Sequence, residues 1–240
     1  MTRRRWIADE VCGDRAALVG EHAAHLARVL RARVGQEFDI AAAGRVRRGR
    51  VAAVSLERVE FELGGEVCIA VGLPLTLLLS IFKFDRLEWA IEKLTELGAA
   101  RLVPVIAGRT DAHLAQAAGK RVERWRRIAS EAAEQSRRAN APEVAAPAKL
   151  REAAAGVQGL RIFLDESEER ITLKQALRER APGQAVALAF GPEGGWTEEE
   201  AQGLRAAGWK AALLGGRILR AETAAIAATA LVAAELEAES

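Results

Sequence analysis

The sequence of 240 residues contains no tyrosine, one methionine, two cysteines and three histidines. The two cysteines, Cys12 and Cys68, are too few for a disulfide framework and lack the spacing of a metal site. Three histidines are also too few to favour a zinc or copper centre, so we expect no metal. We attribute the lack of tyrosine, beside abundant alanine and arginine, to genomic base composition.

Long hydrophobic runs are also missing. Residues 73–82 form one of the longest apolar stretches, well short of the ~20 residues that cross a bilayer. The N-terminal Arg3, Arg4 and Arg5 lead into a short apolar stretch and then into acids, unlike a signal peptide. Half of the residues are apolar and the net charge is +2, a balance untypical of a disordered chain. We therefore expect a soluble cytoplasmic protein with no membrane partner, built from one large or two modest domains.

Positive charge gathers in two regions. Residues 1–50 hold eleven arginines against six acidic residues, and residues 120–138 hold seven basic residues against three acidic ones. Basic regions on an otherwise acidic chain favour contact with a polyanion such as RNA, because phosphate neutralisation supplies most sequence-independent affinity. An ordinary arginine-rich surface explains the same pattern equally well.

The first 70 residues predict a small β-barrel module with one helix. Apolar residues at 23, 26, 27 and 30 follow the helical period, so residues 21–30 are expected to form the helix. Short strands are expected over residues 37–41, 50–54 and 58–63, with turns at Gly35, Gly44 and Gly49. Modules of this size often carry RNA binding.

From residue 73 onward, strands and helices alternate, which predicts an α/β domain with a mostly parallel sheet over residues 73–240. Strands are expected at residues 73–82, 102–107, 160–164, 185–190 and 211–214. Helices are expected from a cap at Asp85 to Gly98, and at residues 121–138, 172–180, 197–207 and 222–237.

A glycine-rich loop follows the predicted strand 185–190 and comprises Gly191, Pro192, Glu193, Gly194 and Gly195. Such a loop turns sharply and lets a ligand approach the backbone closely, although an ordinary strand-to-helix turn has the same composition. Thr197 and Glu200 form a capping box for the next helix. Because ligands of open α/β sheets bind beyond the carboxyl ends of strands, this loop is a candidate ligand site.

A second glycine loop, Leu214-Gly215-Gly216, follows the last predicted strand. Two such loops could hold a flat neutral group such as adenine through backbone N–H and C=O groups. Arg217 and Arg220 would suit a carboxylate or a phosphate.

Two charged segments allow a functional and a structural interpretation. Residues 121–138 place Trp125 on one helix face and Arg138 on another, and Arg138 lies at the C-terminal end. A solvated helix with internal ion pairs is the structural alternative. The charges of the segment Lys83–Trp89 are interpreted as surface pairs rather than catalytic groups.

Four motifs occur in order: Lys-x-Asp-Arg…Glu-Lys-x-x-Glu-Leu-Gly, Arg-Trp-x-x-Ile-x-x-Glu-Ala-x-Glu-Gln-Ser-x-Arg, Gly-Pro-Glu-Gly-Gly and Leu-Gly-x-x-Ile-Leu-Arg-x-Glu-Thr-Ala. Over residues 83–231 the chain resembles the RsmE-type 16S ribosomal RNA (uracil-N3)-methyltransferases of the SPOUT superfamily. The stretch from His25 through Arg28 and Arg31 to Gly35 resembles the family's PUA-like module. Ala221 departs from the pattern, because threonine is common there, and the amino-terminal strands lack the usual tyrosine and phenylalanine.

The resemblance implies a C-terminal trefoil knot, a homodimer, S-adenosylmethionine as cofactor, and 16S ribosomal RNA or the small ribosomal subunit as partner. Carried over to this chain, the cofactor residues are Leu164, Gly191, Pro192, Glu193, Gly194, Gly195, Leu214, Gly215, Ile218, Leu219 and Arg220, and Asp165 completes the pocket floor.

Catalytic and RNA-binding candidates complete the prediction. Glu222 is the candidate base, and Arg138 and Arg220 are candidates to stabilise charge on uracil. For Glu222, a favourable interaction with the dipole of the last helix is an equally good explanation. The expected RNA-binding residues are Arg3, Arg4, Arg5, Arg28, Arg31, Arg47 and Arg48. The alternative function is a non-enzymatic RNA-binding module, which leaves both glycine loops unexplained.

Overall fold

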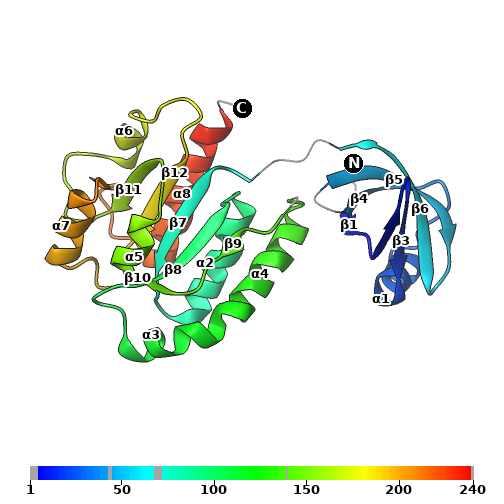
Figure 1. The fold of residues 1–240 in the computed structure, drawn as a ribbon, viewed down its shortest axis with the longest axis horizontal. Helices are drawn as coiled ribbons and strands as arrows, with labels where there is room; N and C mark the ends of the chain where they lie inside the picture. Colours follow the sequence, from blue (N-terminus) through cyan, green and yellow to red (C-terminus); the bar gives the residue numbers. More distant parts are fainter. Residues whose placement is uncertain (1–4, 43–44, 68–71, 139, 239–240) are drawn as a thin grey trace. The chain divides into compact units, whose positions relative to one another are not determined.

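The computed structural model describes residues 5–42, 45–67, 72–138 and 140–238, which fall into two compact units (Figure 1). The first unit comprises Met1–Val71 together with Arg137–Asn140, and the second comprises Gly72–Ser136 and Ala141–Ser240. The predicted domains, 1–70 and 73–240, differ from these units mainly in the segment Arg137–Asn140. Predicted RNA contacts Arg3 and Arg4 and the predicted turn at Gly44 lie outside the described residues.

The first unit is built on a six-stranded curled sheet with the order β1-β4-β5-β6-β3-β2. Its strands are β1 (Arg5–Ile7), β2 (Glu10–Cys12), β3 (Arg15–Val19), β4 (Glu37–Ala42), β5 (Arg45–Val54) and β6 (Arg58–Glu66). Within the described part of this unit, the three-residue strands β1 and β2 are the two edges and do not pair with each other. The β-barrel module expected from the sequence is therefore, over the described residues, a curled half-barrel whose two edge strands do not pair.

Two local predictions in the first unit need correction. The helix expected at residues 21–30 consists of α1 (Gly20–Ala24) followed by one π-helical turn, η1 (His25–Val29), although Ala23 and Leu26 are buried as expected. The turn expected at Gly49 is a position inside β5, opposite Phe38. A Cβ on Gly49 would lie 2.3 Å from Ile40 Cγ1, so this glycine is needed for packing rather than for a turn.

The second unit contains a parallel sheet with the order β10-β8-β7-β12-β11-β13, and β9 also pairs with β8. Its strands are β7 (Leu75–Ser80), β8 (Arg101–Ile106), β9 (Glu143–Val144), β10 (Ala148–Lys149), β11 (Leu160–Leu164), β12 (Val186–Phe190) and β13 (Lys210–Ala212). The central strands are buried on both faces, which explains their continuous apolar sequences. The predicted α/β class with a parallel sheet is confirmed.

Helices cover both faces of this sheet (Figure 1). They are α2 (Phe84–Glu96), α3 (Ala112–Ala118), the 3₁₀ turn η2 (Gly119–Arg121), α4 (Val122–Gln135), α5 (Leu150–Ala155), α6 (Leu173–Leu177), α7 (Glu198–Ala206) and α8 (Ala221–Glu237). Residues of α2, α4, α6 and α8 pack into one apolar core, and residues of α5 and α7 pack into the other. The two apolar cores therefore lie on opposite faces of the sheet.

Two helix boundaries differ from the prediction. Lys83, rather than Asp85, occupies the N-cap position of α2 and makes no side-chain capping hydrogen bond. Asp85 lies in the first turn, where an acid still interacts favourably with the helix dipole. The helix expected at residues 121–138 ends at Gln135, because Ser136 Oγ donates to the carbonyl of Ala132 and Arg137 adopts a left-handed φ of 62°. Arg138 therefore lies beyond the helix rather than on one of its faces.

Candidate active site

The carboxyl ends of β7, β8, β11 and β12 meet at one edge of the parallel sheet. The segments that leave these ends carry Arg86 in the first turn of α2, Arg109 after β8, Asp165 after β11 and the glycine-rich loop after β12. The sequence therefore brings its candidate cofactor loop to the place where open α/β sheets bind ligands.

The glycine-rich loop is held in a tight turn. The N–H of Gly195 donates to the carbonyl of Pro192 at 2.8 Å, and Gly195 has a φ of 71°, a left-handed conformation that glycine adopts without strain. The capping box of Thr197 and Glu200 is present as predicted. Glu200 Oε1 also accepts a hydrogen bond from the backbone N–H of Gly108 at 2.6 Å, which ties this loop to the segment after β8.

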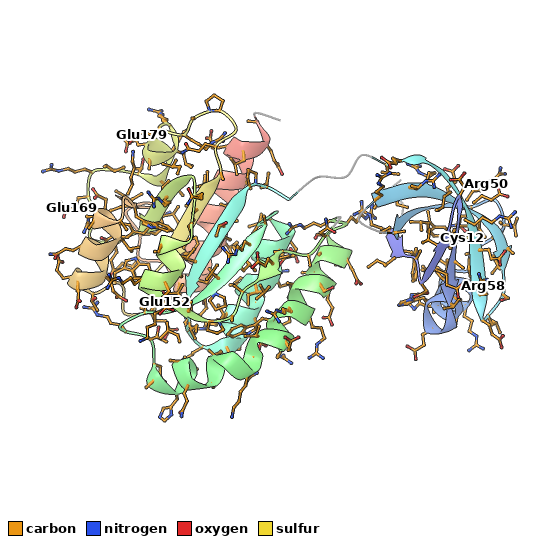
Figure 2. All side chains as sticks on the ribbon, in the orientation of Figure 1. Cys12, Arg50, Arg58, Glu152, Glu169 and Glu179 are labelled. Atoms are coloured by element: carbon orange, nitrogen blue, oxygen red, sulfur yellow. The ribbon has the colours of Figure 1, made fainter. Side chains whose placement is uncertain are left out.

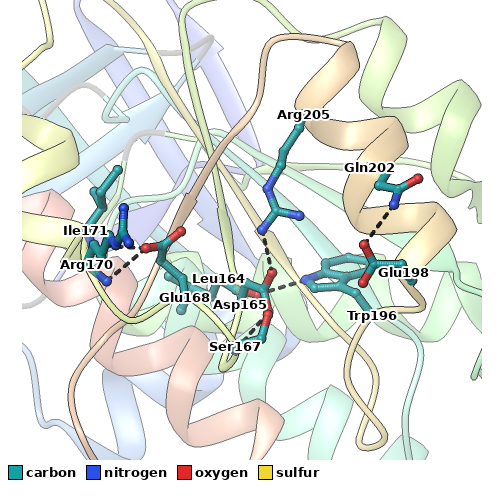
Figure 3. Close-up of polar contacts among 10 residues, drawn as sticks. All are labelled: Leu164, Asp165, Ser167, Glu168, Arg170, Ile171, Trp196, Glu198, Gln202 and Arg205. Atoms are coloured by element: carbon teal, nitrogen blue, oxygen red, sulfur yellow. Dashed lines mark hydrogen bonds and ion pairs between the residues drawn. The ribbon is translucent and has the colours of Figure 1, made fainter.

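Trp196 connects the glycine-rich loop to the end of β11. Its indole Nε1 donates to the carbonyl of Leu164 at 2.8 Å (Figure 3), and a Cβ on Gly191 would lie 3.3 Å from its Cε2 atom. Leu164 was expected to contact the cofactor and Gly191 to belong to the same pocket. One largely buried side chain thus sets the spacing between two predicted binding segments.

Asp165 is engaged within the protein. One carboxylate oxygen accepts from the N–H and the Oγ of Ser167 at 3.0 and 2.7 Å, and the other pairs with Arg205 at 3.1 Å (Figure 3). The guanidinium of Arg205 also lies over the ring of Phe163. These contacts engage both carboxylate oxygens, so Asp165 stabilises the turn after β11.

Glu222 and Glu193 are joined by Arg86. The Nη1 atom of Arg86 donates to Glu193 Oε1 at 3.2 Å, and its Nε atom lies 3.7 Å from Glu222 Oε1. The side chain of Glu222 is only 7% exposed, and its Oε2 is buried with no hydrogen-bond partner among the described residues. An acid that served only the helix dipole could do so at the surface, so the burial of Glu222 favours a chemical role.

Neither Arg86 nor Arg109 was predicted as a site residue, and the charges near Arg86 were interpreted as surface pairs rather than catalytic groups. Arg86 does form ion pairs, and its partners are two predicted site residues, Glu193 and Glu222. Arg109 contacts the loop from the other side, with its Nη1 donating to the carbonyl of Gly194. The Lys-x-Asp-Arg motif marked Arg86, whereas nothing in the sequence marked Arg109.

The second glycine loop is exposed. Leu214 is half-buried, Ile218 is 92% exposed, and Gly215, Leu219 and Arg220 also lie at the surface. Just before this loop, the N–H of Leu213 donates to the carbonyl of Ile171, and its carbonyl accepts from the N–H of Leu173. The guanidinium of Arg220 has no ion pair within the described part of the chain, which leaves it accessible to a ligand.

The predicted RNA contacts of the first unit differ in their surroundings. Arg28 and Arg31 are exposed, whereas Arg5 is half-buried, and burial lowers the pKa of its guanidinium. Arg47 pairs with Asp14 and donates to two backbone carbonyls, and Arg48 pairs with Glu37 and Asp39. Arg50 projects from the outer surface of β5 (Figure 2).

Arg138 is half-buried, and burial lowers the pKa of its guanidinium. It belongs to the segment Arg137–Asn140 that groups with the first unit, whereas Glu222 and Arg220 belong to the second. The three predicted catalytic residues are therefore divided between the two units.

No group of three or more histidine, cysteine, aspartate or glutamate side chains among the described residues could hold a metal ion. None of the helices in the described ranges is both long and apolar enough to cross a bilayer.

Comparison with known proteins identifies the family. Residues 71–233 match the RNA methyltransferase domain family. The ribosomal RNA small subunit methyltransferase E of Bacillus subtilis is 33% identical over 239 residues, which cover 92% of this chain and 90% of that protein. The Synechocystis protein of the same name is 39% identical over 168 residues, 69% of this chain and 54% of that protein, so the match spans about half of that relative.

A solved structure agrees over the full length. The ribosomal RNA small subunit methyltransferase E of Neisseria gonorrhoeae, bound to S-adenosyl methionine, has a TM-score of 0.80 and 31% identity, and the match covers 98% of each chain. The family resemblance of the sequence motifs is thereby confirmed. This chain belongs to the RNA methyltransferase family, together with the ribosomal RNA small subunit methyltransferases E.

Proposed function

We propose that this protein transfers the methyl group of S-adenosylmethionine to N3 of a uridine in the 16S RNA of the small ribosomal subunit. The observation that carries the proposal is the buried carboxylate of Glu222, whose Oε2 lacks a partner among the described residues. This carboxylate lies beside the glycine-rich loop, to which Arg86 connects it.

The residues at this edge of the sheet fit the cofactor. Side chains at Gly191 and Gly194 would crowd Trp196 and Arg109, each with a Cβ 3.3 Å from the neighbouring atom, so the loop keeps a bare backbone there. Gly215 has open space around it, which leaves the backbone of the second loop accessible. We assign cofactor binding to Leu164, Gly191, Pro192, Glu193, Gly194, Gly195, Leu214, Gly215, Ile218, Leu219 and Arg220.

The chemistry asks little of the protein beyond placement and proton transfer. S-adenosylmethionine supplies an electrophilic methyl group on a sulfonium. In the balanced reaction the bond from uracil N3 to carbon forms as the carbon–sulfur bond breaks, the electron pair goes to sulfur, and the N3 proton leaves. We assign Glu222 as the base that accepts this proton, and Arg220 as a cation that stabilises negative charge on uracil oxygens. The role of Arg138 at uracil stays a prediction.

Three further features belong to the proposal. The first unit is a PUA-like RNA-docking module, for which exposed Arg28 and Arg31 are the best-placed phosphate contacts. The second unit is a SPOUT domain with a trefoil knot, supported by the match of residues 71–233 to the RNA methyltransferase domain family. The enzyme acts in the cytoplasm as a homodimer, which would cover the exposed Ile218.

Calorimetric titration with S-adenosylmethionine is the first test. We expect saturable binding, and no binding at millimolar cofactor would overturn the methyltransferase proposal. RNA binding without cofactor binding would favour the non-enzymatic RNA-binding module instead.

The target is tested with small subunits from a strain that lacks this protein. We expect the purified enzyme to restore N3-methyluridine, detected by mass spectrometry of the RNA nucleosides. A different methylated nucleoside would refute the assignment of uracil N3.

A further inference from the structure

Arg86 occupies an unusual position for a cation. It lies in the first turn of α2, at the helix end where the dipole favours acidic side chains. Helix stability alone therefore does not explain an arginine here. Its side chain is 30% exposed and faces two carboxylates from segments far apart in the sequence, Glu193 and Glu222.

The two carboxylates differ in their surroundings. Glu193 belongs to the glycine-rich loop and is 47% exposed, so its pair with Arg86 is screened by solvent. Glu222 is almost entirely buried in the first turn of α8. Among the described residues, Arg86 is the cation that forms an ion pair with it. Because a buried charge without a counter-charge is strongly unfavourable, Glu222 depends on Arg86 far more than Glu193 does.

The geometry of Glu222 points to orientation as well as charge. The Nε atom of Arg86 lies 3.7 Å from Oε1, and Oε2 is buried without a hydrogen-bond partner among the described residues. A counter-charge on one side of a buried carboxylate restricts its orientation, and a general base must be held in reach of the proton that it accepts. Helix α8 packs beside α2, so the pair joins the beginnings of two neighbouring helices.

We propose that Arg86 is a positioning residue for methyl transfer: it holds the carboxylate of Glu222 in place to accept the uracil N3 proton, and it links this base to the cofactor loop through Glu193. This inference rests on the proposed function of Glu222. The reaction rate should then depend on Arg86 through Glu222, and cofactor affinity should depend on it through Glu193.

The test is a double-mutant cycle measured by single-turnover methylation at saturating RNA and cofactor. In the otherwise unchanged protein, Arg86→Met should slow methylation by about tenfold to a hundredfold, the cost expected for a misplaced catalytic group. In the Glu222→Gln background the same change should alter the rate by less than about twofold, because no base is left to position. Arg86→Lys, which keeps the charge and loses the planar guanidinium, should restore part of the rate.

Lys93 provides a matched control on the same helix. It is 31% exposed and pairs with two carboxylates, Glu92 and Glu96, neither of which belongs to the candidate active site. Lys93→Met should leave the rate and the cofactor affinity unchanged, and thermal melting of all variants identifies any loss of folding. Glu193→Gln should weaken cofactor binding to the same extent as Arg86→Met.

The outcomes separate this inference from the proposed function. Equal slowing by Arg86→Met in both backgrounds would overturn it, because Arg86 would then act on a ligand directly. A wild-type rate for a folded Arg86→Met variant would also overturn it and leave the methyltransferase proposal standing. An unaltered protein that neither binds the cofactor nor methylates RNA would instead refute the proposed function itself.

Discussion

Replacing Trp196 by phenylalanine tests whether one hydrogen bond holds the two halves of the cofactor site together. The change removes the 2.8 Å bond from the indole Nε1 to the carbonyl of Leu164. It keeps an aromatic ring beside Phe163, which Trp196 meets edge-on at 6.4 Å and 81°. We expect a loss of about 1 kcal/mol from the hydrogen bond, in addition to the smaller ring.

Trp209 provides a control whose indole N–H, unlike that of Trp196, makes no hydrogen bond among the described residues. It is buried in the same core as Trp196, but its Nε1 has no hydrogen-bond partner within the described part of the chain. Trp209→Phe removes a similar part of the ring. It also removes an unsatisfied N–H donor, and a buried donor without a partner destabilises the native protein by about 1 to 3 kcal/mol. The difference between the two variants therefore isolates the indole N–H, and we expect Trp209→Phe to be more stable by roughly 2 kcal/mol or more.

Thermal melting and cofactor titration on both variants complete this test. A difference of roughly 2 kcal/mol corresponds to about 4 to 8 °C in Tm for a unit of this size. Trp196→Phe should also weaken binding of S-adenosylmethionine severalfold, because Leu164 loses its link to the glycine-rich loop, whereas Trp209→Phe should not. Equal melting temperatures and equal affinities would refute the reasoning.

Three further predictions concern single positions. Gly194→Val should abolish cofactor binding without unfolding the protein, because its Cβ would press on Arg109 at 3.3 Å; normal calorimetric affinity would show that the loop is only a turn. Gly49→Ala should destabilise the first unit by about 1 to 3 kcal/mol in urea unfolding, since its Cβ would overlap Ile40; an unchanged midpoint would contradict this. Arg28→Ala should reduce the salt dependence of RNA binding by about one phosphate contact at constant Tm, and an unchanged slope would exclude Arg28 from the RNA surface.

Local features of the fold could be predicted from the sequence because they depend on neighbouring residues. The strand at residues 160–164 was predicted from the alternation of strands and helices, and the helix at residues 222–237 from its alanine-rich composition, and they agree with β11 and α8 within a residue. The capping box of Thr197 and Glu200 needs only two residues three apart. The glycine-rich loop followed from composition, and its place at the sheet edge followed from strand order.

Short sequence patterns did not predict the contacts between residues that are far apart in the chain. Gly49 was predicted to form a turn, and only its packing against Ile40 from the neighbouring strand shows why a glycine stands inside β5. Arg47 was predicted to contact RNA phosphate, and nothing in the sequence indicated that the folded sheet brings Asp14 to its guanidinium. Whether a charged side chain is available to a ligand depends on partners that only folding supplies.

The candidate site shows the same division. The sequence by itself determined the family, and it predicted the candidate cofactor loops and Glu222 as a candidate base, because these residues stand in short motifs. Only the tertiary structure decided that Arg86 lies between Glu193 and Glu222, residues that are 107 and 136 positions away in the chain. The physical reason is that ion pairing and burial depend on distance in space, and the parallel sheet brings the ends of separate strands to one edge.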